Sequence, residues 1–298
     1  MHIPDGFLAT PVWATLDVVS LPIVGWVARR ARADADESRT PLLGVLGAFV
    51  FAAQMINFPI APGSSAHLLG GALLACTVGP AASMIVLTAV LVIQALVFQD
   101  GGLLALGANI FNIAIVGSLA GYLPFWLLHR NWRSGGLFLG GMLSVFLSGV
   151  CALTQLMLSG VGIPPTVMWG ALAMFAVSSV VEGVATVAVV RAIDRISPAR
   201  VQPGTGSAAA QWILAGIAAV LAGLGFLIAS GAPDSLEAIA ERTGIAVRET
   251  HFLPAPMANY AVQGVELESV ARASAGIMGL VLVYLAVVAV GRALRRSA

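Results

Sequence analysis

Histidines are the side chains of this 298-residue chain best suited to bind a metal, and there are four: His2, His67, His129 and His251. Because His2 is the second residue, its Nδ1, its own amide nitrogen and the α-amine of Met1 can close two fused chelate rings on one ion. His67 could supply a fourth nitrogen. A planar set of four nitrogens suits Ni²⁺ or Cu²⁺, and low-spin Co²⁺ could also accept it. An N-terminal histidine with no role is the competing interpretation.

The chelate requires a free α-amine at Met1. The chain starts without the positively charged stretch that opens a signal peptide. We therefore expect this terminus to be retained, with the bulky His2 protecting Met1 from removal. The two cysteines, Cys76 and Cys151, lie alone in apolar runs and are predicted to be buried core residues.

The composition predicts where such a site must be held. Hydrophobic residues make up 59% of the chain and charged residues 10%, against roughly 25% charged in a soluble domain. This indicates an all-α, polytopic membrane bundle and excludes a soluble enzyme or a nucleic-acid binder. All 15 basic residues are arginine, so the chain has no P-loop lysine. ATP hydrolysis, if it drives this protein, belongs to another subunit.

Nine apolar stretches approach the length of about 20 residues that a membrane helix needs. The run from His67 to Phe98 is ambiguous, because Gly79-Pro80 interrupts it and allows either one kinked helix or two short ones. The predicted stretches are 10–28, 41–58, 67–79, 82–98, 104–128, 135–159, 166–190, 211–230 and 270–291.

The arginines decide between these two topologies, because positive residues gather in cytoplasmic loops. With two helices and the N-terminus outside, twelve arginines fall inside and three outside. With one helix the division becomes seven and eight, which is no bias. We therefore predict nine spans in the plasma membrane, with the N-terminus outside and the C-terminus in the cytoplasm.

The chain divides into two modules. Residues 197–210 have linker composition and separate a seven-span module, residues 1–196, from a two-span module, residues 211–298. The second module carries a predicted outer loop, 231–268, with six of the fourteen acidic residues. This acidic face either attracts cations or merely keeps the loop soluble.

Polar residues within or near the spans are further candidates. Asp17 and Glu182 fall inside predicted spans, where a charge is costly and commonly functional, although a structural hydrogen bond would explain either residue. Stripes of small residues, such as Gly136 and Gly140, predict close helix packing. Five polar residues near the outer helix ends could orient a ligand imidazole or bond between helices: Asn57, Ser64, Ser65, Gln94 and Asn109.

Four segments carry a family resemblance that covers most of residues 1–190. They are MHIPDGFL at 1–8, QMINFPI at 54–60, HLLGGALL at 67–74 and DGGLLALGANIFN at 100–112. In these segments the chain resembles the substrate-binding component of energy-coupling-factor cobalt/nickel transporters, the CbiM/NikM family. PDSLE at 233–237 and PMANYAV at 256–262 resemble the PDGLE domain. Ser235, Ala258 and Asn259 depart from that domain's pattern, which weakens the case that the tail itself binds metal.

The resemblance implies a metal site built from the amine of Met1, the backbone and side chain of His2, and the side chain of His67. It implies Ni²⁺ or Co²⁺ as transported substrate rather than as cofactor. The implied partners are a transmembrane coupling protein and a pair of cytoplasmic ATPases. The alternative is a secondary carrier not driven by ATP. A membrane metalloenzyme is disfavoured, because the chain has no H-E-x-x-H or G-x-S-x-G motif. We also hypothesise that the second module helps to load the metal.

Overall fold

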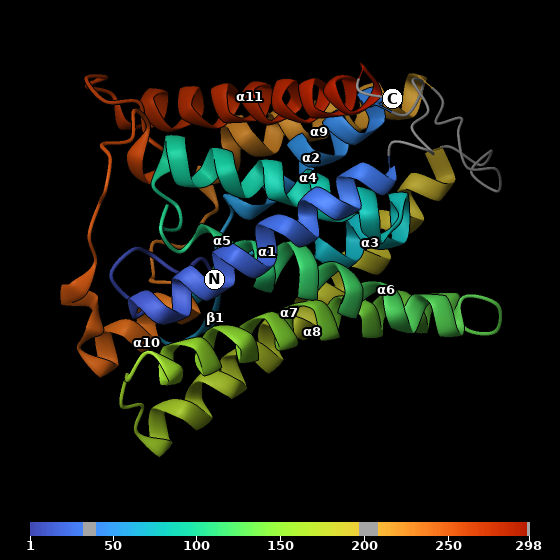
Figure 1. The fold of residues 1–298 in the computed structure, drawn as a ribbon. Coiled ribbons are helices and arrows are strands. Elements are labelled where there is room, and N and C mark those ends of the chain that lie inside the picture. Colours follow the sequence, from blue (N-terminus) through green and yellow to red (C-terminus); the bar gives the residue numbers. More distant parts are fainter. Residues whose placement is uncertain (32–39, 197–207, 297–298) are drawn as a thin grey trace.

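The computed structural model describes residues 1–31, 40–196 and 208–296, and it is almost entirely helical (Figure 1). The α-helices of the first module are α1 (Thr10–Ala31), α2 (Thr40–Gln54), α3 (Gly71–Val78), α4 (Pro80–Ile93), α5 (Leu106–Asn109), α6 (Gly117–Leu128), α7 (Arg133–Leu158) and α8 (Pro165–Ile196). The second module contains α9 (Ala208–Leu224), α10 (Ser235–Thr243) and α11 (Glu268–Arg296).

Membrane crossing follows from length and hydropathy. Six helical stretches among the described residues are long and apolar enough to span a bilayer, and two shorter apolar helices, Thr40–Gln54 and Gln211–Leu227, accompany them. Large apolar side chains on these helices face outward, including Trp169 and Trp212, which are 71% and 78% exposed. Outward apolar surface of this extent fits lipid contact.

The run from His67 to Phe98 forms two helices, as predicted, but the first is not a full span. Gly79 has φ 91°, and Pro80 opens α4, so the helices separate at the expected position. The expected stretch 67–79 is corrected to α3, which has only eight residues and a length of about 12 Å, against a hydrocarbon core of about 30 Å. Its start is delayed because Gly70 adopts a left-handed φ of 78°.

Two wide helical segments interrupt the expected spans 82–98 and 104–128. The end of α4 continues as a π-helix over Gln94–Phe98, and α5 continues as a π-helix over Ile110–Val116 before α6 begins. Such π segments are frequently found at functional sites. Here they lie on either side of the loop that contains Asp100, close to the N-terminus.

Small residues let the first-module helices approach closely. An added Cβ at Gly140 on α7 would lie 2.2 Å from the carbonyl oxygen of Gly121 on α6. On the other face of α7, an added Cβ at Gly141 would lie 2.6 Å from Cα of Gly183 on α8. The small-residue stripe that contains Gly136 and Gly140 therefore serves packing within the chain.

The second module packs against the first rather than standing apart. Helices α9 and α11 lie beside α2, and the loop between them covers the end of the molecule that holds the N-terminus (Figure 1). That loop is structured: it contains α10 and the 3-10 turns Gly225–Leu227, Ile245–Arg248 and Ala258–Tyr260. Most of the predicted linker, 197–207, lies outside the described residues, and 208–210 already belong to α9.

A short antiparallel hairpin is the one strand feature of the described chain and was not predicted. It pairs β1 (Phe58–Ala61) with β2 (Ser64–Ala66) and turns at Gly63, whose φ is 71°. Because His67 follows β2 directly, the hairpin sets the position of this histidine.

Candidate metal site

The N-terminus is buried where the first loop (residues 1–9, before α1), the β-hairpin and the second module meet. Met1, His2 and His67 are only 6%, 5% and 7% exposed. The two imidazole rings lie parallel, with centroids 5.2 Å apart and an interplanar angle of 3°. The three residues that the sequence singles out are therefore brought together, although His2 and His67 are far apart in the chain.

His67 presents a free nitrogen lone pair toward the α-amine of Met1. Its Nε2 lies 2.6 Å from the amine nitrogen, and its Nδ1 lies 3.0 Å from the carbonyl oxygen of Leu68. This pattern fits a neutral ring that donates from Nδ1 and accepts at Nε2, the arrangement commonly found in metal-ligating histidines. Burial, followed by the positive Met1 amine and His2, lowers the pKa of His67 to about 3.

His2 makes a different contact. Its Nδ1 lies 2.8 Å from Oδ1 of Asp100, while its Nε2 is buried without a hydrogen-bond partner. The hydroxyl of Tyr260, from the second module, donates to the other oxygen of Asp100. Burial raises the pKa of Asp100, but the neighbouring His2 outweighs it and holds that pKa well below its ordinary value.

Asp234 brings a second carboxylate to the site. Its Oδ2 lies 2.5 Å from the Met1 amine nitrogen and 4.0 Å from Nε2 of His67. Burial opposes ionisation of this carboxyl, but the positive Met1 amine outweighs it and lowers its pKa. The amine is therefore held between a carboxylate and a neutral imidazole.

The first loop is held in place through its backbone. Asn109 fixes Ile3 at two points: its Oδ1 accepts from the Ile3 N–H at 2.8 Å, and its Nδ2 donates to the Ile3 carbonyl at 3.0 Å. The carboxylate of Asp5 accepts from three consecutive backbone N–H groups, those of Leu103, Leu104 and Ala105. Asn109 is thus placed as a positioning residue for the N-terminus.

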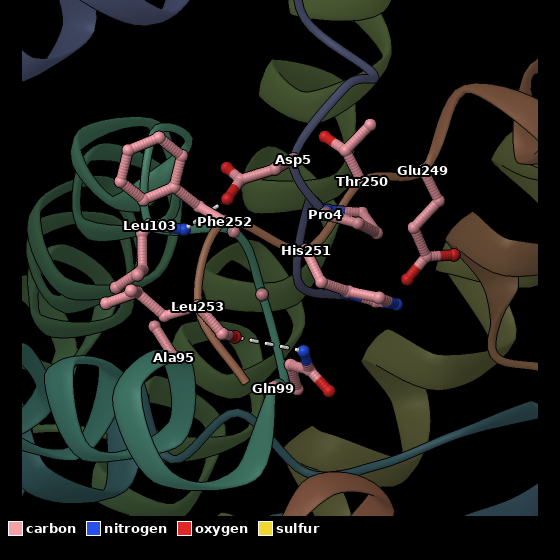
Figure 2. A pocket seen from close by; sticks show the side chains of 12 residues that line it. Pro4, Asp5, Ala95, Gln99, Leu103, Glu249, Thr250, His251, Phe252 and Leu253 are labelled. Carbon is pink, nitrogen blue, oxygen red and sulfur yellow. Dashed lines mark hydrogen bonds between the residues drawn. The ribbon is translucent and has the colours of Figure 1, made fainter. Parts of the chain in front are cut away.

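The first loop also forms a seam with the second module, which Figure 2 shows from close by. Pro4 and Asp5 line one side of a small pocket, and Glu249 and His251 line the other. Two hydrogen bonds join the modules beside this pocket. The Thr250 N–H donates to the Asp5 carbonyl at 3.0 Å, and the Gln99 side chain donates to the Leu253 carbonyl at 3.3 Å. His251 lies at this pocket and not among the residues around Met1.

The other four orienting candidates make no hydrogen bond to His2 or His67 in the described chain. Gln94 donates to Gln54 at 2.9 Å and to the hydroxyl of Tyr260 at 3.2 Å, so it reaches His2 only through Tyr260 and Asp100. Ser65 bonds the backbone of the second module. The hydroxyl of Ser64 is buried without a hydrogen-bond partner, and Asn57 receives a bond from Ser230 at its backbone carbonyl.

Both intramembrane carboxylates bind backbone N–H groups. The Glu182 carboxylate accepts from the backbone N–H groups of Leu69 and Gly70, each at 2.8 Å, and so fixes the loop that follows His67. Asp17 accepts from Gly107 at 2.7 Å. Of the explanations that the sequence left open, the structure favours a hydrogen-bonded one for each.

Side chains alone do not make a metal site here. Among the described residues, no group of three or more histidines, cysteines or acids is placed to hold a metal ion. Sequence reasoning did not single out Asp100, Asp234 or Tyr260 as site residues, and the PDGLE-like segments were the available signal for the last two.

Fold and site together define a multi-pass membrane protein with a buried cluster of nitrogen donors at its N-terminus. Residues 2–200 match the family described as cobalt uptake substrate-specific transmembrane region, CbiM. Residues 209–296 match the PDGLE domain. The chain belongs to the CbiM family, the substrate-specific component of energy-coupling-factor cobalt/nickel transporters, with a fused PDGLE domain. This is a family of transport proteins and not of enzymes.

Relatives and solved structures agree with this assignment. A putative metal transport protein of Haloquadratum walsbyi is 41% identical and covers 66% of this chain and 92% of its own length. A probable fused nickel transport protein, LarMN, of Lactiplantibacillus plantarum is 32% identical over 78% of this chain and 76% of its own. The crystal structure of a transition metal transporter superposes with a TM-score of 0.59 and 31% identity, covering 66% of this chain and 93% of that one.

Proposed function

We propose that this protein captures Ni²⁺ or Co²⁺ on the outer side of the membrane, at a site made by the Met1 amine, the amide nitrogen and Nδ1 of His2, and Nε2 of His67. The metal is then passed inward with energy from partner ATPases and a transmembrane coupling protein. The observation that carries the proposal is the Met1 amine 2.6 Å from the lone pair of His67 Nε2.

This spacing supports a planar site. With metal–nitrogen bonds of about 2.0–2.1 Å, two ligands at a right angle stand about 2.9 Å apart. The Met1 and His67 nitrogens are already near that separation. Closing the chelate requires His2 Nδ1 to turn from Asp100 toward the amine.

The charge of the site suits an exchange of protons for a divalent ion. Binding of one metal displaces one proton from the amine and one from the His2 amide nitrogen, and the proton that His2 Nδ1 donates to Asp100 passes to Nε2 of the same ring. The donor cluster then carries +1 both before and after the exchange. The buried carboxylates of Asp100 and Asp234 serve as counter-charges in both cases.

A secondary carrier is the weaker alternative. Such carriers use charged relays near the midplane, whereas Asp17 and Glu182 are both committed to backbone N–H groups. Because the sequence has no lysine for a P-loop, ATP hydrolysis that drives uptake belongs to partner subunits.

The first test compares Ni²⁺ and Co²⁺ binding to purified protein whose chain starts at Met1 with protein extended by a short tag. The extension removes the α-amine and leaves every side chain in place. We expect it to abolish tight binding, and unchanged affinity would refute the N-terminal chelate. Reconstitution into vesicles with and without the partner ATPases then separates ATP-driven uptake from uptake driven by an ion gradient.

A further inference from the structure

The second module is bonded to the strand that leads into His67. The Ser65 N–H donates to the Pro233 carbonyl at 2.8 Å, and the Ser65 hydroxyl donates to the Ala232 carbonyl at 2.7 Å. Ser65 and Asp234 also form a parallel bridge. Because Ser65 is two residues from His67, these bonds fix Asp234 relative to the histidine.

The two oxygens of Asp234 have separate partners. Oδ1 accepts from the N–H groups of Leu236 at 2.7 Å and Glu237 at 2.9 Å, which makes Asp234 the N-cap of α10. Oδ2 faces the Met1 amine. Since Oδ1 is engaged at the start of the helix, Oδ2 cannot turn from the amine without breaking the cap.

We propose that Asp234 is a positioning residue through which the second module holds the Met1 amine beside His67 Nε2. This proposal rests on the N-terminal metal site proposed above. Chain termini are usually poorly ordered unless something ties them down. This contact fixes one chelate nitrogen next to another before the metal arrives. The PDGLE-like module thus acts on the metal site directly, without itself being a ligand.

The composition of the chain offers a selective probe. With no lysine in the sequence, the α-amine is the only primary amine available for acylation. Its reaction with acetyl N-hydroxysuccinimide, followed by intact-mass spectrometry, therefore reports on Met1 alone. In the wild-type protein we expect slow labelling, because Met1 is buried and paired.

Asp234→Asn is the test variant and Glu237→Gln is its matched control. Asparagine still caps a helix but carries no charge. Glu237 forms the other half of the capping box, accepting from the Asp234 N–H at 2.7 Å, and is not bonded to Met1. Both changes disturb the start of α10, but only the first removes the amine contact. Asp234→Ser is a second uncharged cap, to be used if Asp234→Asn fails to fold.

We expect Asp234→Asn to speed acetylation at least tenfold. We also expect it to weaken Ni²⁺ binding about tenfold, as for other residues that orient ligands. Calorimetry on the full chain measures this affinity. Glu237→Gln should match the wild type in both. If His67→Ala abolishes binding while Asp234→Asn keeps the wild-type labelling rate and affinity, the positioning role is overturned and the N-terminal site stands. If His67→Ala leaves binding intact, the proposed site itself fails.

Discussion

At the scale of single residues, His67 should make stability depend on pH. In the fold its pKa is about 3, whereas an unfolded histidine titrates near 6.5. Between these values the unfolded chain binds a proton that the folded chain does not, so the free energy of unfolding rises with pH, by up to about 1.4 kcal/mol per unit.

The measurement is denaturant unfolding in detergent, followed by tryptophan fluorescence between pH 5 and 7. This window lies above the range in which Asp100 and Asp234, whose pKa values are lowered, would take up protons. His67→Gln should lose this part of the slope. An identical slope in the variant would mean that His67 is not the neutral group.

Glu182 should act on metal binding through the loop that follows His67. Glu182→Gln leaves one of the N–H groups of Leu69 and Gly70 without an acceptor, a loss of about 1–3 kcal/mol in unfolding free energy. We also expect about tenfold weaker Ni²⁺ binding, since His67 loses its support. Asp17→Asn is the control, because Asp17 holds Gly107 instead. The asparagine oxygen can still accept this bond, so the affinity should match that of the wild type. Equal affinity in both variants would exclude the positioning effect of Glu182.

The proposed ligand residues could be singled out from sequence, but their surroundings could not. Residue type and place in the chain define the chelate of Met1 and His2. The contacts of Asp100 and Asp234 depend on segments far apart in the sequence meeting at one point. No local pattern encodes that meeting, and only the PDGLE-like signature marked Asp234 as unusual.

At the scale of elements, the first loop needs a glycine opposite it. An added Cβ at Gly102 would lie 2.0 Å from Asp5 Oδ1 and 2.4 Å from the Asp5 backbone nitrogen. Gly102→Ala should therefore push the loop away from its bonds with residues 103–105, costing about 1–3 kcal/mol and weakening metal binding. Gly162→Ala is the matched control, because an added Cβ there meets nothing within 4 Å. Thermal unfolding and calorimetry check both variants, and equal behaviour would contradict this role for Gly102.

Hydropathy predicts the long helices well but not the elements around the site. Long apolar runs must form helices in lipid, because every backbone group needs a partner. The β-hairpin and α10 lie at the site end of the bundle, and the short α3 starts four residues after His67 (Figure 1). In these places protein contacts can satisfy the backbone instead. Their form depends on local features such as the left-handed Gly70 and the cap at Asp234.

At the scale of the whole molecule, the two modules close over the proposed metal site. Met1, His2 and His67 are all buried, and bonds from the second module to Asp5, Val97 and Ser65 surround them. A hydrated divalent ion needs a path to donors enclosed in this way. We therefore expect the second module to move when metal enters.

A reversible lock between the modules tests this motion. The Met257 N–H donates to the Val97 carbonyl at 3.0 Å, so the two backbones are in direct contact, which a disulfide between these positions would require. In Val97→Cys/Met257→Cys, oxidation should slow Ni²⁺ association at least about tenfold, because the loop that carries Tyr260 can no longer leave the site. Reductant should restore the association rate in the variant, which controls for the substitutions themselves. It should leave the wild-type rate unchanged, which controls for Cys76 and Cys151. Rapid association in the oxidised variant would show that metal reaches the site without separation of residues 97 and 257.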